Sequence, residues 1–141
     1  MKERPGAGFI FYRIVHGEPR FLLIRSARNP NRWDFVKGGV EGNETRLACA
    51  WREAYEEAGY SPGDYDHHES FRTVWEYTNN HGVYRKIVLF LAKCNKDPQL
   101  SDEHIMHEYV TLTQAEELLR FDEQKNCLRE ASAYIQNIKL T

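Results

Sequence analysis

The N-terminal third of the chain alternates between short apolar runs and polar turns. Residues 8–12 and 20–24 are rich in Phe, Ile, Leu and Tyr, and the segment between them contains Gly17 and Pro19. Apolar runs bounded by turn residues are typical of β-strands. The pattern therefore predicts two strands joined by a turn, and then a third short strand at residues 34–36 that enters a glycine-rich loop.

The middle of the chain has the pattern of a β-hairpin. Residues 69–78 alternate loosely between apolar and polar positions, and residues 84–92 form a strongly apolar run. The residues between them, 79–82, read Asn-Asn-His-Gly, which is a composition typical of turns. Two antiparallel strands are expected here.

The C-terminal region changes to helical spacing. Thr113 and Glu116 have the three-residue separation of a capping box, which predicts a helix to about residue 120. Asp122 is the expected cap of a second helix. Its apolar positions recur at helical spacing: Leu128, Ala131, Ile135 and Ile138. Strands that surround one internal helix and end in further helices indicate an α+β fold.

The internal helix carries an unusual acidic face. At about 100° per residue, Glu53, Glu56 and Glu57 fall on one side, and the apolar residues Leu47, Trp51, Ala54 and Ala58 are expected on another. Carboxylates this close repel one another, and they lie in the half of the helix where the macrodipole disfavours anions. A hard divalent cation such as Mg²⁺ would compensate, and it typically keeps open positions for phosphate oxygens.

The residues around this face favour a phosphate ligand. Gly38 and Gly39 allow close approach of the backbone, and Lys37 adds a cation just upstream. Arg52 precedes Glu56 by four residues and is expected to orient it. The competing interpretation is a solvated helix face with one intrahelical ion pair.

Composition limits the alternatives. The 141 residues, 41% hydrophobic and 28% charged, predict one compact domain, residues 1–141. The net charge of −2 offers no general attraction for polyanions, so no stable nucleic-acid partner is expected. We see neither a signal peptide nor a membrane span, and three widely spaced cysteines argue for reduced thiols. We therefore expect a cytoplasmic or nuclear protein, and a monomer in preference to a dimer.

Residues 38–60 resemble the Nudix box. Every fixed position of that motif is met at the right spacing by Gly38, Glu44, Arg52, Glu53, Glu56, Glu57 and Gly59. Two aliphatic positions of the motif hold Ala54 and Tyr60, which affects packing. The resemblance implies an α/β/α sandwich with a mixed sheet between helices. It also implies hydrolysis of phosphate anhydrides with Mg²⁺, or alternatively Mn²⁺, held by Glu53, Glu56, Glu57 and the Gly38 carbonyl.

Beyond the box, the chain is similar to the animal-type asymmetric diadenosine tetraphosphate (Ap4A) hydrolases over nearly its full length. The shared landmarks are Gly8, the strand at 21–23, Trp33 and the segment 100–104. This resemblance implies a Mg²⁺-dependent enzyme that cleaves Ap4A to ATP and AMP. It implies that Glu103 either binds metal or acts as the general base, and Glu57 is the other candidate base. Glu53 and Arg52 are the further residues expected to take part in catalysis.

The same resemblance suggests contacts with substrate. Tyr77 and Phe121 match the positions of an adenine clamp, and Arg85 matches a phosphate contact alongside Lys37, with Lys86 and Arg25 as weaker candidates. His107 and Tyr109 stand where the family has a tyrosine and a tryptophan. His107 is therefore a candidate substrate contact that departs from the pattern.

Several alternatives stay open. Residues 28–33 also resemble diphosphoinositol polyphosphate phosphohydrolases and their diadenosine hexaphosphate-cleaving relatives. Capped RNA and other nucleoside diphosphate derivatives are further substrates within the family's chemistry. An inactive nucleotide-sensing module is the non-enzymatic alternative, although such proteins usually lose box glutamates. A zinc pair of His104 and His107 is a weak further interpretation.

Overall fold

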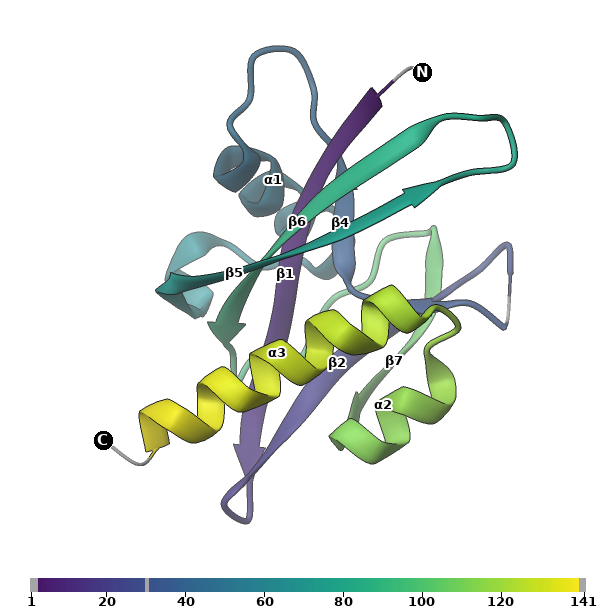
Figure 1. Cartoon of the computed structure of the whole chain (residues 1–141). Coiled ribbons are helices and arrows are strands. Elements are labelled where there is room, and N and C mark those ends of the chain that lie inside the picture. The colour runs from purple at the N-terminus through teal and green to yellow at the C-terminus, as the bar shows by residue number, and fades with distance from the viewer. Residues whose placement is uncertain (1–2, 30, 140–141) are drawn as a thin grey trace.

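A computed structural model describes residues 3–29 and 31–139 as a sheet packed between helices (Figure 1). The strands are β1 (Glu3–Val15), β2 (Glu18–Ser26), β3 (Trp33–Asp34), β4 (Val36–Gly39), β5 (Asp66–Thr78), β6 (Tyr84–Lys93) and β7 (His104–Val110). The helices are α1 (Arg46–Ala58), α2 (Leu112–Leu118) and α3 (Asp122–Lys139), with a short 3-10 turn at Pro62–Asp64.

The sheet is mixed and has β1 near its centre. The main strand order is β3-β2-β1-β6-β5, with β4 paired to β1 and β7 paired to β2. Strands β1 and β6 run parallel, whereas the other paired strands are antiparallel. One apolar core lies between the sheet and helices α2 and α3, and a second lies on the face covered by α1. The expected α+β sandwich is confirmed.

Helix α1 is held by caps at both ends. Thr45 accepts a hydrogen bond from the Ala48 N–H, and Gly59 ends the helix with a φ of 70°, a conformation that glycine adopts without strain. The buried side consists of small residues that let the helix lie close to the sheet: Cys49, Ala50, Ala54 and Ala58. Trp51 is 39% exposed, so its predicted place on the packed face is wrong, while Glu53 is 9% exposed at the edge of that face.

Four local features of the structure differ from the predictions. The short strand expected at 34–36 is two strands, because the Asp34 carboxylate accepts the Phe35 N–H and the chain passes from pairing with β2 to pairing with β1. Strand β7 was not predicted. Helix α2 begins after Thr111 rather than at Thr113, since Thr111 and Gln114 form the capping box and the buried residue Ala115 fixes the register. Asp122 is the first residue of α3 rather than its cap.

The two residues that depart from the aliphatic positions of the box lie in the packed core, as expected. Ala54 and Tyr60 are fully buried, and the Tyr60 hydroxyl donates to the Lys96 carbonyl at 2.5 Å. The three cysteines are free and buried. Cys49 lies beside the glycine-rich loop, with its Sγ 3.6 Å from the Gly38 carbonyl oxygen.

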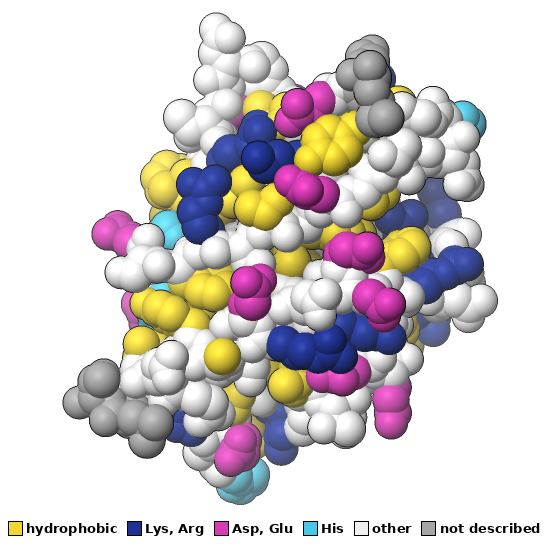
Figure 2. Space-filling model, in the orientation of Figure 1, with side chains coloured by type: hydrophobic (Ala, Val, Ile, Leu, Met, Phe, Trp, Pro, Cys, Tyr) yellow, Lys and Arg dark blue, Asp and Glu magenta, His cyan; other side chains and the backbone are white. Residues whose placement is uncertain are grey.

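The surface supports no extended basic stripe on the α2–α3 side. On the face seen in Figure 2, Lys and Arg side chains are interspersed with Asp and Glu. Among the described residues, no helix combines the length and apolar character needed to cross a membrane.

Candidate active site

The glycine loop and helix α1 meet in a close contact at Gly38, where a side chain would displace the Glu53 carboxylate. A Cβ atom on Gly38 would lie 2.1 Å from the Glu53 carboxyl carbon, far inside van der Waals contact. The Glu53 carboxylate therefore rests directly against the backbone of β4. Because Gly38 has no side chain, its backbone and the Glu53 carboxylate can lie close together.

Arg52 ties the loop to the helix. Its guanidinium binds both carboxylate oxygens of Glu44, at 2.8 and 3.0 Å, and donates to the Gly39 carbonyl at 2.8 Å. The same group contacts Glu53 at 3.0 Å and Glu56 at 3.1 Å. The pKa of Glu44 is lowered by its hydrogen bond to Arg52. Arg52 is thus placed to orient the acidic side chains, as the sequence suggested.

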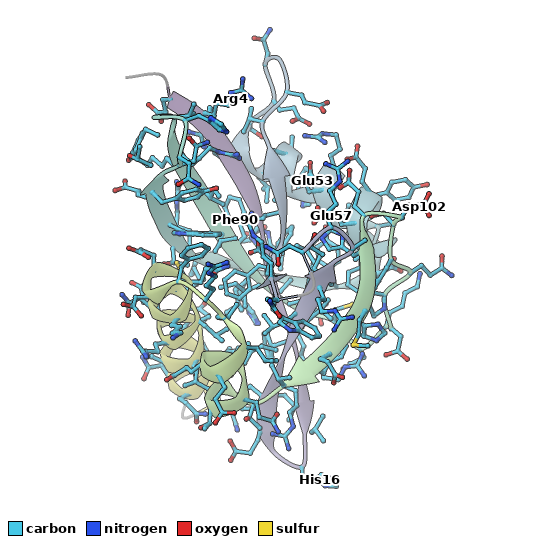
Figure 3. The ribbon with its side chains drawn as sticks, turned by 90° about the vertical axis from the view of Figure 1, so that its right-hand side faces the viewer. Arg4, His16, Glu53, Glu57, Phe90 and Asp102 are labelled. Atoms are coloured by element: carbon cyan, nitrogen blue, oxygen red, sulfur yellow. The ribbon has the colours of Figure 1, made fainter. Side chains whose placement is uncertain are left out.

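Glu57 and Glu53 form a partly desolvated acidic pair. They lie on one side of α1, and the loop at Asp102 is near the same end of the molecule (Figure 3). Burial, followed by the charge of Glu53, raises the pKa of Glu57 to about 8, although the Lys37 N–H donates to its Oε1 at 3.0 Å. Burial also raises the pKa of Glu53, with the charge of Arg52 opposing the shift. Such a pair is costly without a cation nearby.

Glu57 opens onto a cleft of about 260 Å³ with a cationic wall. The lining residues are Ser26, Arg28, Arg32, Asp34, Phe35, Lys37, Glu57, Glu103 and His104. Carboxylates from α1 and from the loop before β7 thus share one space with three cationic side chains. The main chain joins two walls of the cleft, since the Ala27 N–H donates to the Glu103 carbonyl at 2.9 Å.

Comparison with known proteins identifies the arrangement. Residues 2–131 match the NUDIX domain. The chain belongs to the Nudix family. It is 31% identical to a bis(5'-nucleosyl)-tetraphosphatase [asymmetrical] of Caenorhabditis elegans over 131 residues, which are 92% of this chain and 94% of that protein. It is 30% identical to the pig (Sus scrofa) protein of the same name, over 82% of this chain and 80% of that one.

Solved structures agree with this assignment. A binary complex of a C. elegans Ap4A hydrolase superposes with a TM-score of 0.90 at 29% identity, covering 95% of this chain and 98% of that one. The Nudix chain described here is a hydrolase of phosphoric anhydrides. The relatives resemble it across the whole sandwich rather than in the box alone.

The aromatic residues expected to clamp a base lie together in the Nudix fold. Tyr77 stacks on Trp75 with ring centroids 5.0 Å apart, and Phe121 lies 6.1 Å from the same ring. The Lys37 ammonium is 5.0 Å from the Trp75 centroid, so the aromatic group adjoins the cationic wall. Phe121 is 38% exposed, which leaves its ring available to a ligand.

The other predicted contacts are more dispersed. The Arg85 guanidinium is half-buried near Gly6, where a Cβ would meet both Arg85 and the Gly38 carbonyl. Arg25 lies over the Trp33 ring, and Glu103 is exposed at the cleft. His107 contacts the Tyr109 ring and does not line the cleft. An irregularity in the β2–β7 pairing places His104 opposite Ser26 and His107 opposite Ile24, so strand alternation does not separate the two histidines. Only His104 lines the cleft, and a zinc pair stays a weak interpretation, because two histidines without further ligands do not complete a zinc site.

The donors present fit a hard divalent cation. All five predicted ligands, Gly38, Glu53, Glu56, Glu57 and Glu103, offer oxygen. Burial raises the pKa values of Glu53 and Glu57, and a bound cation would oppose this shift by favouring the ionised carboxylates. Within residues 3–29 and 31–139, no three His, Cys, Asp or Glu side chains are grouped as a ready metal site. Glu53 and Glu56 instead form ion pairs with Arg52. The ligand set stays a prediction.

Sequence reasoning overlooked part of the cleft. Residues 28–33 serve there only for a family resemblance, and Asp34 is placed in a short strand. No role at the site is predicted for Arg28, Arg32 or Asp34. The available signal was a pair of arginines four residues apart just before a glycine loop. Neither guanidinium has an ion-pair partner among the described residues, although Asp34, Glu57 and Glu103 line the same cleft.

Proposed function

We propose that this Nudix hydrolase cleaves dinucleoside polyphosphates, with Ap4A giving ATP and AMP. The observation that carries the proposal is the cleft, in which Glu57 and Glu103 face Arg28, Arg32 and Lys37. A polyphosphate chain suits this wall, because guanidinium groups form charge-assisted hydrogen bonds with phosphate oxygens. The names of the tetraphosphatases that the chain resembles support the same substrate class.

The metal is expected to be Mg²⁺, with Mn²⁺ as the alternative. Gly38, Glu53, Glu56, Glu57 and Glu103 would hold it. When bound, the cation would neutralise phosphate oxygens and lower the pKa of water. Arg52 would keep Glu53 and Glu56 aimed at the cation through the contacts described above.

The remaining residues have distinct roles in this proposal. Glu57 or Glu103 accepts the proton from the attacking water. Lys37 and Arg85 stabilise negative charge on the phosphate chain as it is cleaved. Tyr77 and Phe121 stack on a base, which favours nucleotides without selecting strongly among bases. His107 remains a candidate contact only if the substrate reaches past the cleft.

A second candidate is the diphosphoinositol polyphosphate and diadenosine hexaphosphate class. Arg28 and Arg32 favour it, since two unpaired guanidinium groups in one cleft suit a substrate with more phosphates. The aromatic group around Trp75 favours a nucleotide instead. RNA caps are a less supported alternative, given the mixed charge of the surface in Figure 2.

We also propose a monomer in the cytoplasm or nucleus, as a single domain. The three free, buried cysteines suit a reducing compartment. Light scattering after size exclusion tests the monomer, and a second copy in the particle would contradict it.

A substrate panel tests the function. Ap4A, diadenosine hexaphosphate, an inositol pyrophosphate, capped RNA and a nucleoside diphosphate sugar are incubated with Mg²⁺, and the products are resolved by ion exchange. We expect ATP and AMP from Ap4A at the highest kcat/KM, and ¹⁸O from labelled water in one product identifies the phosphorus attacked. Preference for the inositol substrate would support the second candidate. Binding without turnover of any substrate would favour a nucleotide sensor.

A further inference from the structure

Gln124 is a buried polar residue whose two hydrogen bonds lead to the site. Its side chain is 1% exposed, near the start of α3. A buried amide is costly unless both its donor and its acceptor are used. Here Nε2 donates to Asp34 Oδ1 at 3.0 Å, and Oε1 accepts the Phe121 N–H at 3.3 Å. One side chain therefore touches both the segment carrying Phe121 and the wall of the cleft.

Asp34 continues the contact to Lys37. Its Oδ1 also accepts the Phe35 N–H at 2.8 Å, which fixes the carboxylate against the backbone. Its Oδ2 pairs with the Lys37 ammonium at 3.0 Å, and the side chains of Asp34 and Lys37 are each 14% exposed. The Asp34 carboxylate thus positions the Lys37 ammonium through Oδ2, and Gln124 and the Phe35 N–H hold its Oδ1.

These contacts cross the sandwich. Helices α1 and α3 cover opposite faces of the sheet (Figure 1), and both reach Lys37. From α1, Glu57 accepts the Lys37 N–H, and from α3, Gln124 acts through Asp34. Phe121 and the Lys37 ammonium also both contact the Trp75 ring. These short, partly buried contacts connect the Phe121 segment with the Lys37 ammonium.

We infer that Gln124 and Asp34 are positioning residues that couple the aromatic site at Phe121 to the phosphate-facing ammonium of Lys37. The inference rests on the proposed roles of Phe121 and Lys37 in nucleotide binding. Neither Gln124 nor Asp34 needs to touch the reacting atoms. Their consequence is cooperativity: a base stacked on Phe121 and a phosphate at Lys37 bind better together than the separate contacts predict.

A double-mutant cycle tests the coupling by binding alone. The variants are Gln124→Met, which keeps the size but removes both hydrogen bonds, Lys37→Met, and the two combined. The ligand is a dinucleoside tetraphosphate with methylene bridges that resist hydrolysis. We expect Gln124→Met to weaken binding about 10-fold in the wild-type background and less than about 2-fold when Lys37 is already replaced. Gln136→Met, at an exposed glutamine of the same helix, should leave the Kd unchanged.

A purely structural role for Gln124 predicts something different. In that case Gln124→Met weakens binding equally in both backgrounds, and the inference is overturned, as it is by an unchanged Kd in the single variant. If Gln124→Met does not fold, Asp34→Asn takes its place, because it keeps an Oδ1 acceptor for Gln124 and Phe35 and removes the charge that pairs with Lys37.

An NMR measurement on the ligand-free protein separates this inference from the proposed function. Lys37→Met should shift the Phe121 amide resonance, and the shift should vanish in the Gln124→Met background. If the wild type binds no dinucleotide analogue, the proposed substrate fails, while the amide shifts still decide whether the link exists. A Phe121 shift that persists without Gln124 would overturn the link even if the enzyme hydrolyses Ap4A.

Discussion

The backbone N–H of Lys37 donates to Glu57 Oε1 at 3.0 Å, so strand β4 and helix α1 share a hydrogen bond in the wall of the cleft. This bond favours the ionised carboxylate, but burial and the nearby charge of Glu53 outweigh it and leave the pKa of Glu57 raised. The residue that presents an ammonium to the cleft thus also holds the carboxylate expected to meet the metal. Lys37 of β4 would therefore link the proposed positions of metal and phosphate.

Replacing Gly38 by alanine should lower activity without unfolding the protein. The new Cβ would overlap the Glu53 carboxyl group at 2.1 Å, so that side chain must leave its place. We expect Mg²⁺ affinity and kcat/KM to fall by about 10- to 100-fold, the range typical when the groups that position a metal ligand are disturbed. Titration calorimetry and turnover measure the two effects.

Gly39→Ala is the matched control. The neighbouring glycine has open space around its would-be Cβ, and its φ lies in the ordinary range. Activity should stay near wild type. Equal losses in the Gly38 and Gly39 variants would show that the loop needs flexibility rather than room for Glu53.

The acidic helix could be predicted from sequence because its pattern is local. Spacings of three and four residues place Glu53, Glu56 and Glu57 on adjacent positions of any α-helix, whatever surrounds it. The cleft is different, since Arg28 and His104 line it together only when β7 pairs with β2. That pairing was missed because β7 is a short edge strand with exposed polar residues, which leaves a weak apolar pattern.

The start of α2 shows another limit of local signals. The sequence contains two overlapping capping patterns, Thr111 with Gln114 and Thr113 with Glu116. Both have the spacing of a capping box, so the pattern alone does not decide where the helix begins. Packing decides it, because a helix that starts after Thr111 buries Ala115 against the core. Tertiary contacts decided between two equally good caps.

The stability of the metal-free protein should fall as pH rises from about 5 to about 8. Glu57 has an ordinary pKa of 4.5 when unfolded and a pKa of about 8 in the fold, so the native state binds more protons across this window. The free energy of unfolding then decreases with pH. Thermal unfolding in a chelator should show this slope, and Glu57→Gln should flatten it.

Saturating Mg²⁺ provides the second arm of that experiment. A cation beside Glu57 favours the ionised carboxylate, so the decline in stability between pH 5 and 8 should shrink. The same slope in the wild type and in Glu57→Gln, measured without metal, would rule out Glu57 as its source.

Glu56→Gln should leave the fold intact and lower turnover by about 10³-fold, since loss of a metal-binding oxygen costs several kcal/mol of transition-state stabilisation. The Glu56 side chain is 52% exposed, and Arg52 is its one ion-pair partner within the described part of the chain, so stability should change by less than about 1 kcal/mol. Single-turnover kinetics at saturating Mg²⁺ is the measurement, with Glu117→Gln at an exposed position of α2 as control. Unchanged turnover would remove Glu56 from the mechanism.

Arg28→Ala and Arg32→Ala should raise KM by about 10-fold each with little change in kcat. Charge-assisted hydrogen bonds to phosphate are worth about 1.5–3 kcal/mol, and binding falls tenfold for each 1.4 kcal/mol lost. The loss should grow with the number of phosphates, so diadenosine hexaphosphate should suffer more than Ap4A. Arg72→Ala, at an exposed arginine outside the cleft lining, is the control. A larger effect on kcat than on KM would assign these arginines to the chemical step instead.

Phe121→Ala should weaken binding of the nucleotide by about 10- to 100-fold, because stacking a base on an aromatic ring is worth about 1–3 kcal/mol. Phe121→Trp should restore most of it, since it keeps a ring for the base. Tyr55→Ala removes an aromatic side chain that is 65% exposed on α1 and should have no effect. Diadenosine and diguanosine tetraphosphates should lose affinity alike, because every base offers a face for stacking. A loss confined to one base would mean that Phe121 acts through a selective contact rather than a stacking surface.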